Sequence, residues 1–131
     1  MQNSATPPGD DVTTDETQNL IAADKVIGTA VYNRRGEHLG SLYGLMLNKL
    51  NGRVAYAVMS FGGFLGMGES HHPLPWKMLS YDPRIQGYVV DLDRDQLVEA
   101  PSYTVQDAPD WADAGYGKRI DLYYGTLGFS V

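Results

Sequence analysis

Two adjacent histidines, His71 and His72, preceded by Glu69, are the residues in this chain best suited to chemistry. Imidazole can ligate a metal ion or titrate near neutral pH, and a nearby carboxylate can orient the ring. Neighbouring side chains of an extended segment point to opposite faces, so one ion cannot readily reach both rings. A metal or small-ligand site at these histidines is one hypothesis. The alternative leaves His71 facing solvent and His72 hydrogen-bonded within a sheet.

The other patterns that could support ion binding or catalysis are incomplete. The run Asp91–Asp95 begins like a calcium loop, but Gln96 stands where that loop needs glycine and Ser102 where it needs a bidentate glutamate. The chain has no cysteine and no Gly-x-Ser-x-Gly motif, and Ser60 and Ser70 have no evident base nearby in the sequence. We therefore expect no catalytic residue, no cofactor and no enzyme activity.

A glycine-rich stretch, residues 62–68, lies between an apolar run and the prolines Pro73 and Pro75. Glycine-rich backbone binds phosphate where it opens a helix, but the prolines disfavour a helix here, and neither GxGxxG nor a following Gly-Lys-Ser/Thr is present. We interpret the stretch as a connection whose tip offers an apolar patch to a protein partner. That patch consists of Phe64, Leu65 and Met67.

The composition indicates one small domain, because 131 residues with 43% apolar side chains can bury one core. The formal charge is −6, but the first 19 residues contribute four acidic and no basic side chains. The ten Lys and Arg residues are scattered, so we expect no nucleic-acid binding.

No apolar run approaches the roughly 18 residues of a transmembrane segment, and no secretory signal is evident. We expect a cytoplasmic protein, with peripheral association with a membrane complex left open.

The chain divides into three parts by its pattern. Residues 1–19 are polar, acidic and proline-containing, which predicts a disordered acidic tail, because such a segment cannot bury enough surface to offset its ordering entropy. Residues 20–103 carry β-like runs and form the expected domain. Residues 104–131 form a C-terminal extension, which we expect to pack on that domain or on a second subunit.

Runs of β-branched and aromatic residues between turn signals predict strands at residues 26–32, 37–48, 54–61 and 87–91. The third run is apolar on both faces, which is typical of a central strand. Asn51-Gly52 predicts a type I′ hairpin turn, and Asp93 with Gln96 predicts a helix capping box.

Residues 120–124 are also β-like, and Trp76 should point inward from the short segment 74–79. The residues that we expect to be structural are Gly36, Gly52, Gly62, Gly63, Gly66, Pro75 and Trp76.

Residues 25–103 resemble the PRC-barrel family. The matching pieces include Val26-Ile27-Gly28, Gly36-Glu37, Asn51-Gly52-Arg53-Val54, Gly62-Gly63-Phe64-Leu65-Gly66, Leu74-Pro75-Trp76 and Ala100-Pro101. The resemblance implies a mostly β fold: a small, strongly bent antiparallel β-barrel, here with short helical turns and the C-terminal extension. The family is named for the cytoplasmic part of the photosynthetic reaction centre H subunit, and a similar barrel occurs in the ribosomal 16S rRNA maturation factor.

Those relatives use the barrel as an adaptor in assemblies, so the resemblance implies protein–protein interaction and carries no catalytic residue over. We expect a homodimer or another protein partner, contacted through Phe64, Leu65, Met67, Trp111, Tyr123 and Tyr124. The chain departs from the family at residues 70–73, where relatives often place a basic residue and a β-branched pair. A small-ligand or metal-binding sensor centred on His71 and His72 is the alternative, and neither the photosynthetic nor the ribosomal role is inherited.

Overall fold

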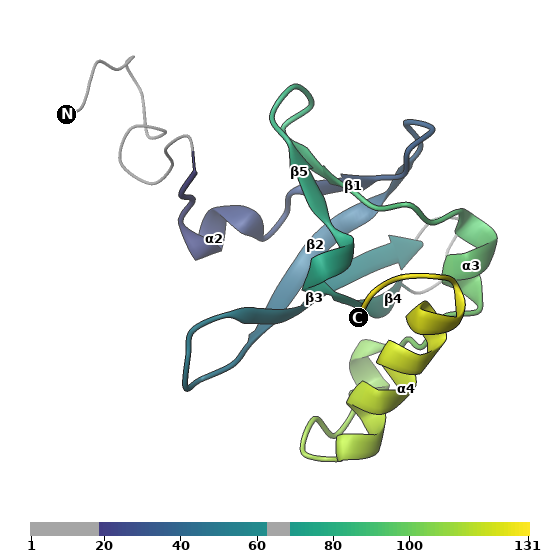
Figure 1. The fold of residues 1–131 in the computed structure, drawn as a ribbon. Helices are drawn as coiled ribbons and strands as arrows, with labels where there is room; N and C mark the ends of the chain where they lie inside the picture. Colours follow the sequence, from purple (N-terminus) through teal and green to yellow (C-terminus); the bar gives the residue numbers. More distant parts are fainter. Residues whose placement is uncertain (1–18, 63–68) are drawn as a thin grey trace.

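The computed structural model describes residues 19–62 and 69–131, and Figure 1 shows their arrangement. The six strands are β1 (Ala30–Tyr32), β2 (His38–Leu47), β3 (Val54–Gly62), β4 (Glu69–Pro75), β5 (Ser80–Asp82) and β6 (Gly87–Val89). The helices are α2 (Ala23–Val26), α3 (Arg94–Val98) and α4 (Ala114–Thr126), with 3₁₀ turns η1 (Trp76–Met78) and η2 (Val105–Asp107). Among the described residues no helix is long and apolar enough to cross a membrane. The predicted acidic tail lies almost wholly outside these residues.

All six strands belong to one sheet, in the order β4-β3-β2-β1-β6-β5. Every neighbouring pair is antiparallel except β1 and β6. In Figure 1, β1 and β5 run at a steep angle to β2 and β3. The expected mostly antiparallel sheet is confirmed, although α4 makes the fold mixed α/β. In the described part of the chain no pairing joins the outermost strands β4 and β5, so closure of the sheet into a barrel stays a prediction.

The long strand β2 curls because its pairing with β3 is irregular. The register shifts between Leu42 and Gly44 and again between Met46 and Leu47. Gly40 allows the closest approach, since a Cβ added there would lie 1.9 Å from the carbonyl oxygen of Ser60. Bulges and glycines of this kind bend a strand and strengthen its twist. Gly40 and the register shift next to Gly44 therefore fit the curl of β2.

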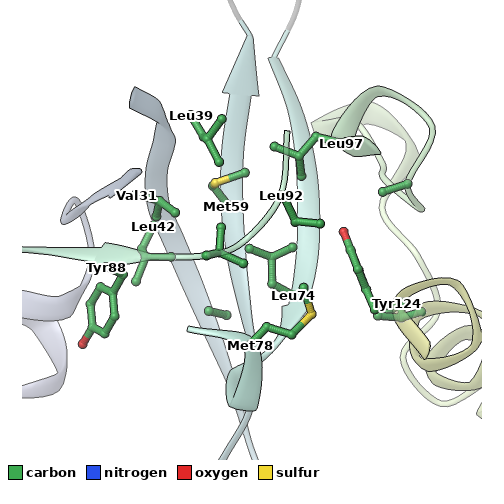
Figure 2. Close-up of a cluster of buried hydrophobic side chains, with 14 of the residues drawn as sticks. Val31, Leu39, Leu42, Met59, Leu74, Met78, Tyr88, Leu92, Leu97 and Tyr124 are labelled. Atoms are coloured by element: carbon green, nitrogen blue, oxygen red, sulfur yellow. The ribbon is translucent and has the colours of Figure 1, made fainter. Parts of the chain in front are cut away.

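The strand β3 lies between β2 and β4, which confirms the prediction of a central strand. Its consecutive residues Ala57, Val58 and Met59 are all buried, so both faces of the sheet are covered at this point. One face belongs to the main core, which Figure 2 shows between the strands, the 3₁₀ turn and α3. The core includes Val31, Leu39, Leu42, Met59, Leu74, Met78, Tyr88, Leu92 and Leu97.

The C-terminal segment corrects the sequence prediction, because residues 120–124 are helical and not extended. The side chain of Asp113 caps α4 by accepting a hydrogen bond of 2.9 Å from the backbone N–H of Gly115. Tyr116, Ile120 and Tyr124 recur every four residues and are the buried residues of this helix. That spacing places them on one face of the helix. Packing of this face overrides the β propensity of the local sequence.

Two turn predictions have different outcomes. The capping box at Asp93 is confirmed: its side chain accepts from the backbone N–H of Gln96 at 2.8 Å, and the backbone N–H of Asp93 donates to the Gln96 side chain at 3.0 Å. The type I′ turn at Asn51-Gly52 is wrong, since Gly52 has φ 77° but Asn51 does not have positive φ. The hairpin is closed by a hydrogen bond from Asn48 N–H to the carbonyl of Arg53, and so it has a longer loop.

Candidate functional site

The histidines lie in the middle of β4, which pairs with β3 along its whole length. His71 stands opposite Ser60, and His72 stands opposite Met59. Because successive side chains of a strand alternate between faces, the two imidazoles point to opposite sides of the sheet. Each ring has only 1% of its residue surface exposed. The expectation that His71 faces solvent is therefore wrong.

The His71 ring is enclosed by aromatic side chains from two other parts of the chain. Tyr43 of β2 stacks on it, with ring centroids 4.1 Å apart and an angle of 20° between the planes. Tyr103 meets it edge-on at 5.3 Å, and the backbones of His71 and Tyr103 exchange hydrogen bonds of 2.8 and 3.0 Å. Tyr103, the residue just before the C-terminal extension, thus covers this side of β4 and completes the burial of His71.

Within this enclosure, the two ring nitrogens of His71 lack hydrogen-bond partners among the described residues. The carboxylate oxygen Oε1 of Glu69 lies 3.5 Å from Nε2, which is too long for a strong hydrogen bond and is an ion pair only when the ring is protonated. The Glu69 side chain is about half exposed, at 53%, so water screens its charge. The site therefore holds a buried imidazole beside a solvated carboxylate.

His72 faces the core side of the sheet and has a better-defined polar contact. Its Nε2 lies 2.9 Å from Oγ of Ser70, whose hydroxyl also donates to the carbonyl of Phe61 at 3.3 Å. A hydroxyl has one proton, so while Ser70 donates to Phe61, His72 donates to Ser70 through Nε2. Burial, with a smaller effect from His71, lowers the pKa of His72 to about 4. His72 is consequently a neutral structural residue at physiological pH.

Among the described residues, the histidines do not form a three-ligand site for a metal ion. In the described part of the chain, no three His, Asp or Glu side chains come together closely enough to hold one. The third histidine, His38, begins β2 and packs against Tyr32 with ring centroids 5.4 Å apart. It lines a polar pocket of about 360 Å³ together with Ser41, Ser60, Glu69 and Arg94, among other residues.

The aromatic residues proposed as partner contacts hold the C-terminal extension to the sheet. Trp111 is partly buried against Tyr56, at 5.7 Å between ring centroids, and against Tyr116 at 5.0 Å. The Tyr123 hydroxyl donates to the carbonyl of Gln96 at 2.5 Å. Tyr124 has 0% of its surface exposed, so it is a core residue and not part of an exposed contact surface.

One further bond ties α4 to the strands. The Tyr56 hydroxyl donates to the Asp121 carboxylate at 3.1 Å. Burial first, and the Asp121 charge second, raise the pKa of Tyr56 to about 12, so this donor keeps its proton across the physiological range. The extension is therefore attached to the sheet by aromatic packing and by specific hydrogen bonds.

Some of the remaining predicted site residues lie outside the described part of the chain, and the others lie within it. Phe64, Leu65, Met67, Gly63 and Gly66 lie outside the described residues. Gly36 and Gly62 have φ of 83° and 89°, values that favour glycine, which fits their predicted structural role. Pro75 is buried at the end of β4, whereas Trp76 begins η1, is only partly buried and meets Tyr88 edge-on at 5.5 Å.

Sequence reasoning did not identify the most exposed large apolar side chain of the described chain. Leu50, at the turn between β2 and β3, is 98% exposed, and Leu47 at the end of β2 is 51% exposed. The sequence does carry a signal for a contact surface here. Lys49 and Arg53 flank Leu50, and no acidic residue occurs between Glu37 and Glu69. A hairpin turn with this composition is a candidate contact surface.

The comparisons with known proteins agree with this fold. The model of the PRC-barrel domain family matches residues 18–97, which is more than half of the chain. The chain therefore belongs to the PRC-barrel domain family, as the sequence predicted. A comparison with curated proteins found no match. The family match ends within α3, so η2 and α4 lie beyond it. Tyr103, which contacts His71, also lies beyond it.

Proposed function

We propose that this PRC-barrel protein is a non-catalytic protein-interaction module that acts as an adaptor in the cytoplasm, and that it is homodimeric. The observation that carries the proposal is the burial of the side chains best suited to chemistry. His71 and His72 are both packed into the sheet with 1% exposure, so neither is presented to a substrate. Large aliphatic side chains, in contrast, stand exposed on the hairpin, on α3 and on α4.

The proposed protein contact surface combines the apolar residues Phe64, Leu65 and Met67 with the accessible parts of Trp111 and Tyr123. Apolar side chains gathered at one place on a surface favour a protein partner. A C₂ dimer would use the same patch from both copies. Tyr124 is left out of the surface because it is fully buried.

Light scattering on the purified full chain, before and after Leu65→Asp, tests the proposal. We expect a dimer that the charged substitution converts to a monomer. Val105→Asp is the matched control, because Val105 is a large aliphatic residue that is 64% exposed on η2 and lies outside the proposed surface. A dimer that persists in Leu65→Asp would contradict the role of the loop, and a monomeric wild-type chain would contradict the dimer.

A second function, a small-ligand or metal-binding sensor, is favoured by the unpartnered ring nitrogens of His71. Half-exposed Tyr43 covers that ring, so a modest movement of the tyrosine would give a ligand access to it. A thermal-shift screen with divalent ions and small polar ligands tests this function. A shift in Tm that His71→Ala removes and His72→Ala retains would support it, whereas a shift common to both variants or no shift would contradict it.

A further inference from the structure

The turn between β2 and β3 projects from the sheet and ends in an apolar side chain. We call residues 47–53 the hairpin tip. Figure 1 shows it extending well beyond the other strands and away from α3 and α4. Leu50 at its end is 98% exposed, and Leu47 at its shoulder is 51% exposed. Leu50 thus contributes nothing to the chain's own core.

The backbone of the hairpin tip is internally hydrogen-bonded. The side-chain oxygen of Asn48 accepts from the N–H groups of Leu50 at 2.9 Å and Asn51 at 3.2 Å, and its carbonyl accepts from Gly52 N–H at 2.8 Å. The side-chain oxygen of Asn51 accepts from Arg53 N–H at 2.8 Å. These four N–H groups therefore need no water, which lowers the penalty for bringing the turn into an interfacial environment. The same bonds fix Leu50 in its outward position.

The charge of the hairpin tip has the opposite sign to that of the whole chain. Lys49 and Arg53 lie on either side of Leu50 and are both exposed. The chain carries a formal charge of −6, yet no Asp or Glu occurs from His38 through Gly62. An anionic surface would therefore attract this end of the molecule and repel the acidic parts, so that the charge distribution itself orients the approach.

We propose that the hairpin tip docks on an anionic lipid bilayer, with Leu50 in the interfacial region and Lys49 and Arg53 against the phosphates of the headgroups. A bilayer suits this feature better than a protein does. A stable protein interface needs about 800 Å² from each partner, which a turn of a few residues does not supply, whereas a bilayer accepts a single projecting apolar side chain without a matching pocket. This lipid contact goes beyond the protein-binding function proposed above and does not depend on it.

The expected binding is weak for one copy and sensitive to salt. Each basic side chain near an anionic membrane strengthens binding roughly fivefold, and partitioning of Leu50 adds roughly tenfold. Screening within a Debye length weakens the basic contribution at high ionic strength. Two hairpin tips in one dimer would strengthen the attachment further, if they face the same bilayer.

Because the chain has no cysteine, a single environment-sensitive fluorophore can be placed by one substitution. In the full chain, Leu47→Cys carries the probe beside an intact Leu50, and Val98→Cys on α3 is the matched control, since Val98 is 68% exposed. At low salt we expect vesicles of phosphatidylglycerol, and not of phosphatidylcholine, to shift the emission of the Leu47 probe to the blue. The Val98 probe should not shift. No shift at the Leu47 position, or equal shifts at both positions, overturns the proposal.

Co-sedimentation of the unlabelled chain with the same vesicles measures the contribution of each side chain. We expect Leu50→Ser to weaken binding roughly tenfold and the double substitution Lys49→Glu and Arg53→Glu to weaken it more than roughly twentyfold. Val98→Ser and Arg34→Glu, at the opposite end of β2, serve as controls and should bind like the wild type. Circular dichroism checks that each variant is folded.

Two results, one from co-sedimentation and one from a separate pull-down, would overturn the proposal. One is binding to the vesicles that is unchanged by the hairpin variants. The other is retention of the chain by immobilised poly-glutamate, abolished by Lys49→Glu with Arg53→Glu, in the absence of vesicle binding. The second result would assign the hairpin tip to an acidic protein partner.

Discussion

The ring of Tyr43 stacks on the ring of His71 at a centroid distance of 4.1 Å, joining the exposed surface of β2 to a buried imidazole of β4. Tyr43 is 53% exposed, whereas His71 is 1% exposed. The tyrosine therefore acts as a cover whose inner side completes the packing of the histidine and whose outer side meets water. Together with the contact from Tyr103, it explains how His71 can be buried although β4 is the outermost strand of the sheet.

Replacing His71 with phenylalanine should retain the stability of the protein or raise its free energy of unfolding by about 1 kcal/mol. Phenylalanine keeps the ring against Tyr43 but removes two buried nitrogens without partners, each of which costs free energy when unpaired. His71→Ala should instead lower stability by about 2–3 kcal/mol, because it leaves a cavity. Urea unfolding monitored by tryptophan fluorescence measures both. A loss larger than about 1 kcal/mol in His71→Phe would mean that the nitrogens have partners.

Acid should destabilise the fold through His72. Its pKa in the folded state is lowered from 6.5 to about 4, so the unfolded chain binds the proton more tightly. Stability from this group is complete above pH 6.5, and it falls by about 3 kcal/mol as the pH drops through this window toward the folded-state pKa. Unfolding at pH 7 and pH about 4.5 should show the loss, and His72→Gln, which keeps a partner for Ser70, should show much less of it. An equal loss in the variant would assign the acid sensitivity to other groups.

The features that the sequence predicts correctly are those that depend on residues close together in the chain. The turn glycines Gly36 and Gly52, the capping box and the double-sided apolar run of β3 each depend on neighbours in the chain. The burial of His71 could not be predicted in this way, because it depends on Tyr43 and Tyr103, which come from distant segments.

The error at residues 120–124 has a related cause. The β-branched and aromatic residues there have high strand propensity, and glycines before and after them weaken a helix. The helix forms because a single face carrying Ile120 and Tyr124 packs into the core. Tertiary contacts therefore decided the structure of that segment.

Trp76→Ala should cost about 2 kcal/mol, less than the about 3–5 kcal/mol typical of a fully buried aromatic residue. Trp76 is only partly buried, and part of its contribution comes from the edge-on contact with Tyr88 at 5.5 Å. A double-mutant cycle with Tyr88→Ala should give a coupling energy of about 0.5–1.5 kcal/mol. Additive effects of the two substitutions would show that the rings do not interact in solution.

Gly40→Ala should be among the most damaging single-methyl changes in the protein. The added Cβ would lie 1.9 Å from the backbone oxygen of Ser60, and neither strand can move without breaking the β2–β3 pairing that supports β4. We expect a loss of at least about 2–3 kcal/mol. Gly44→Ala is the matched control in the same strand, because nothing lies within 4 Å of its added Cβ and it should change stability little. Thermal unfolding of the two variants tests the curvature of β2 directly, since equal Tm values would mean that the close approach at Gly40 does not exist in solution.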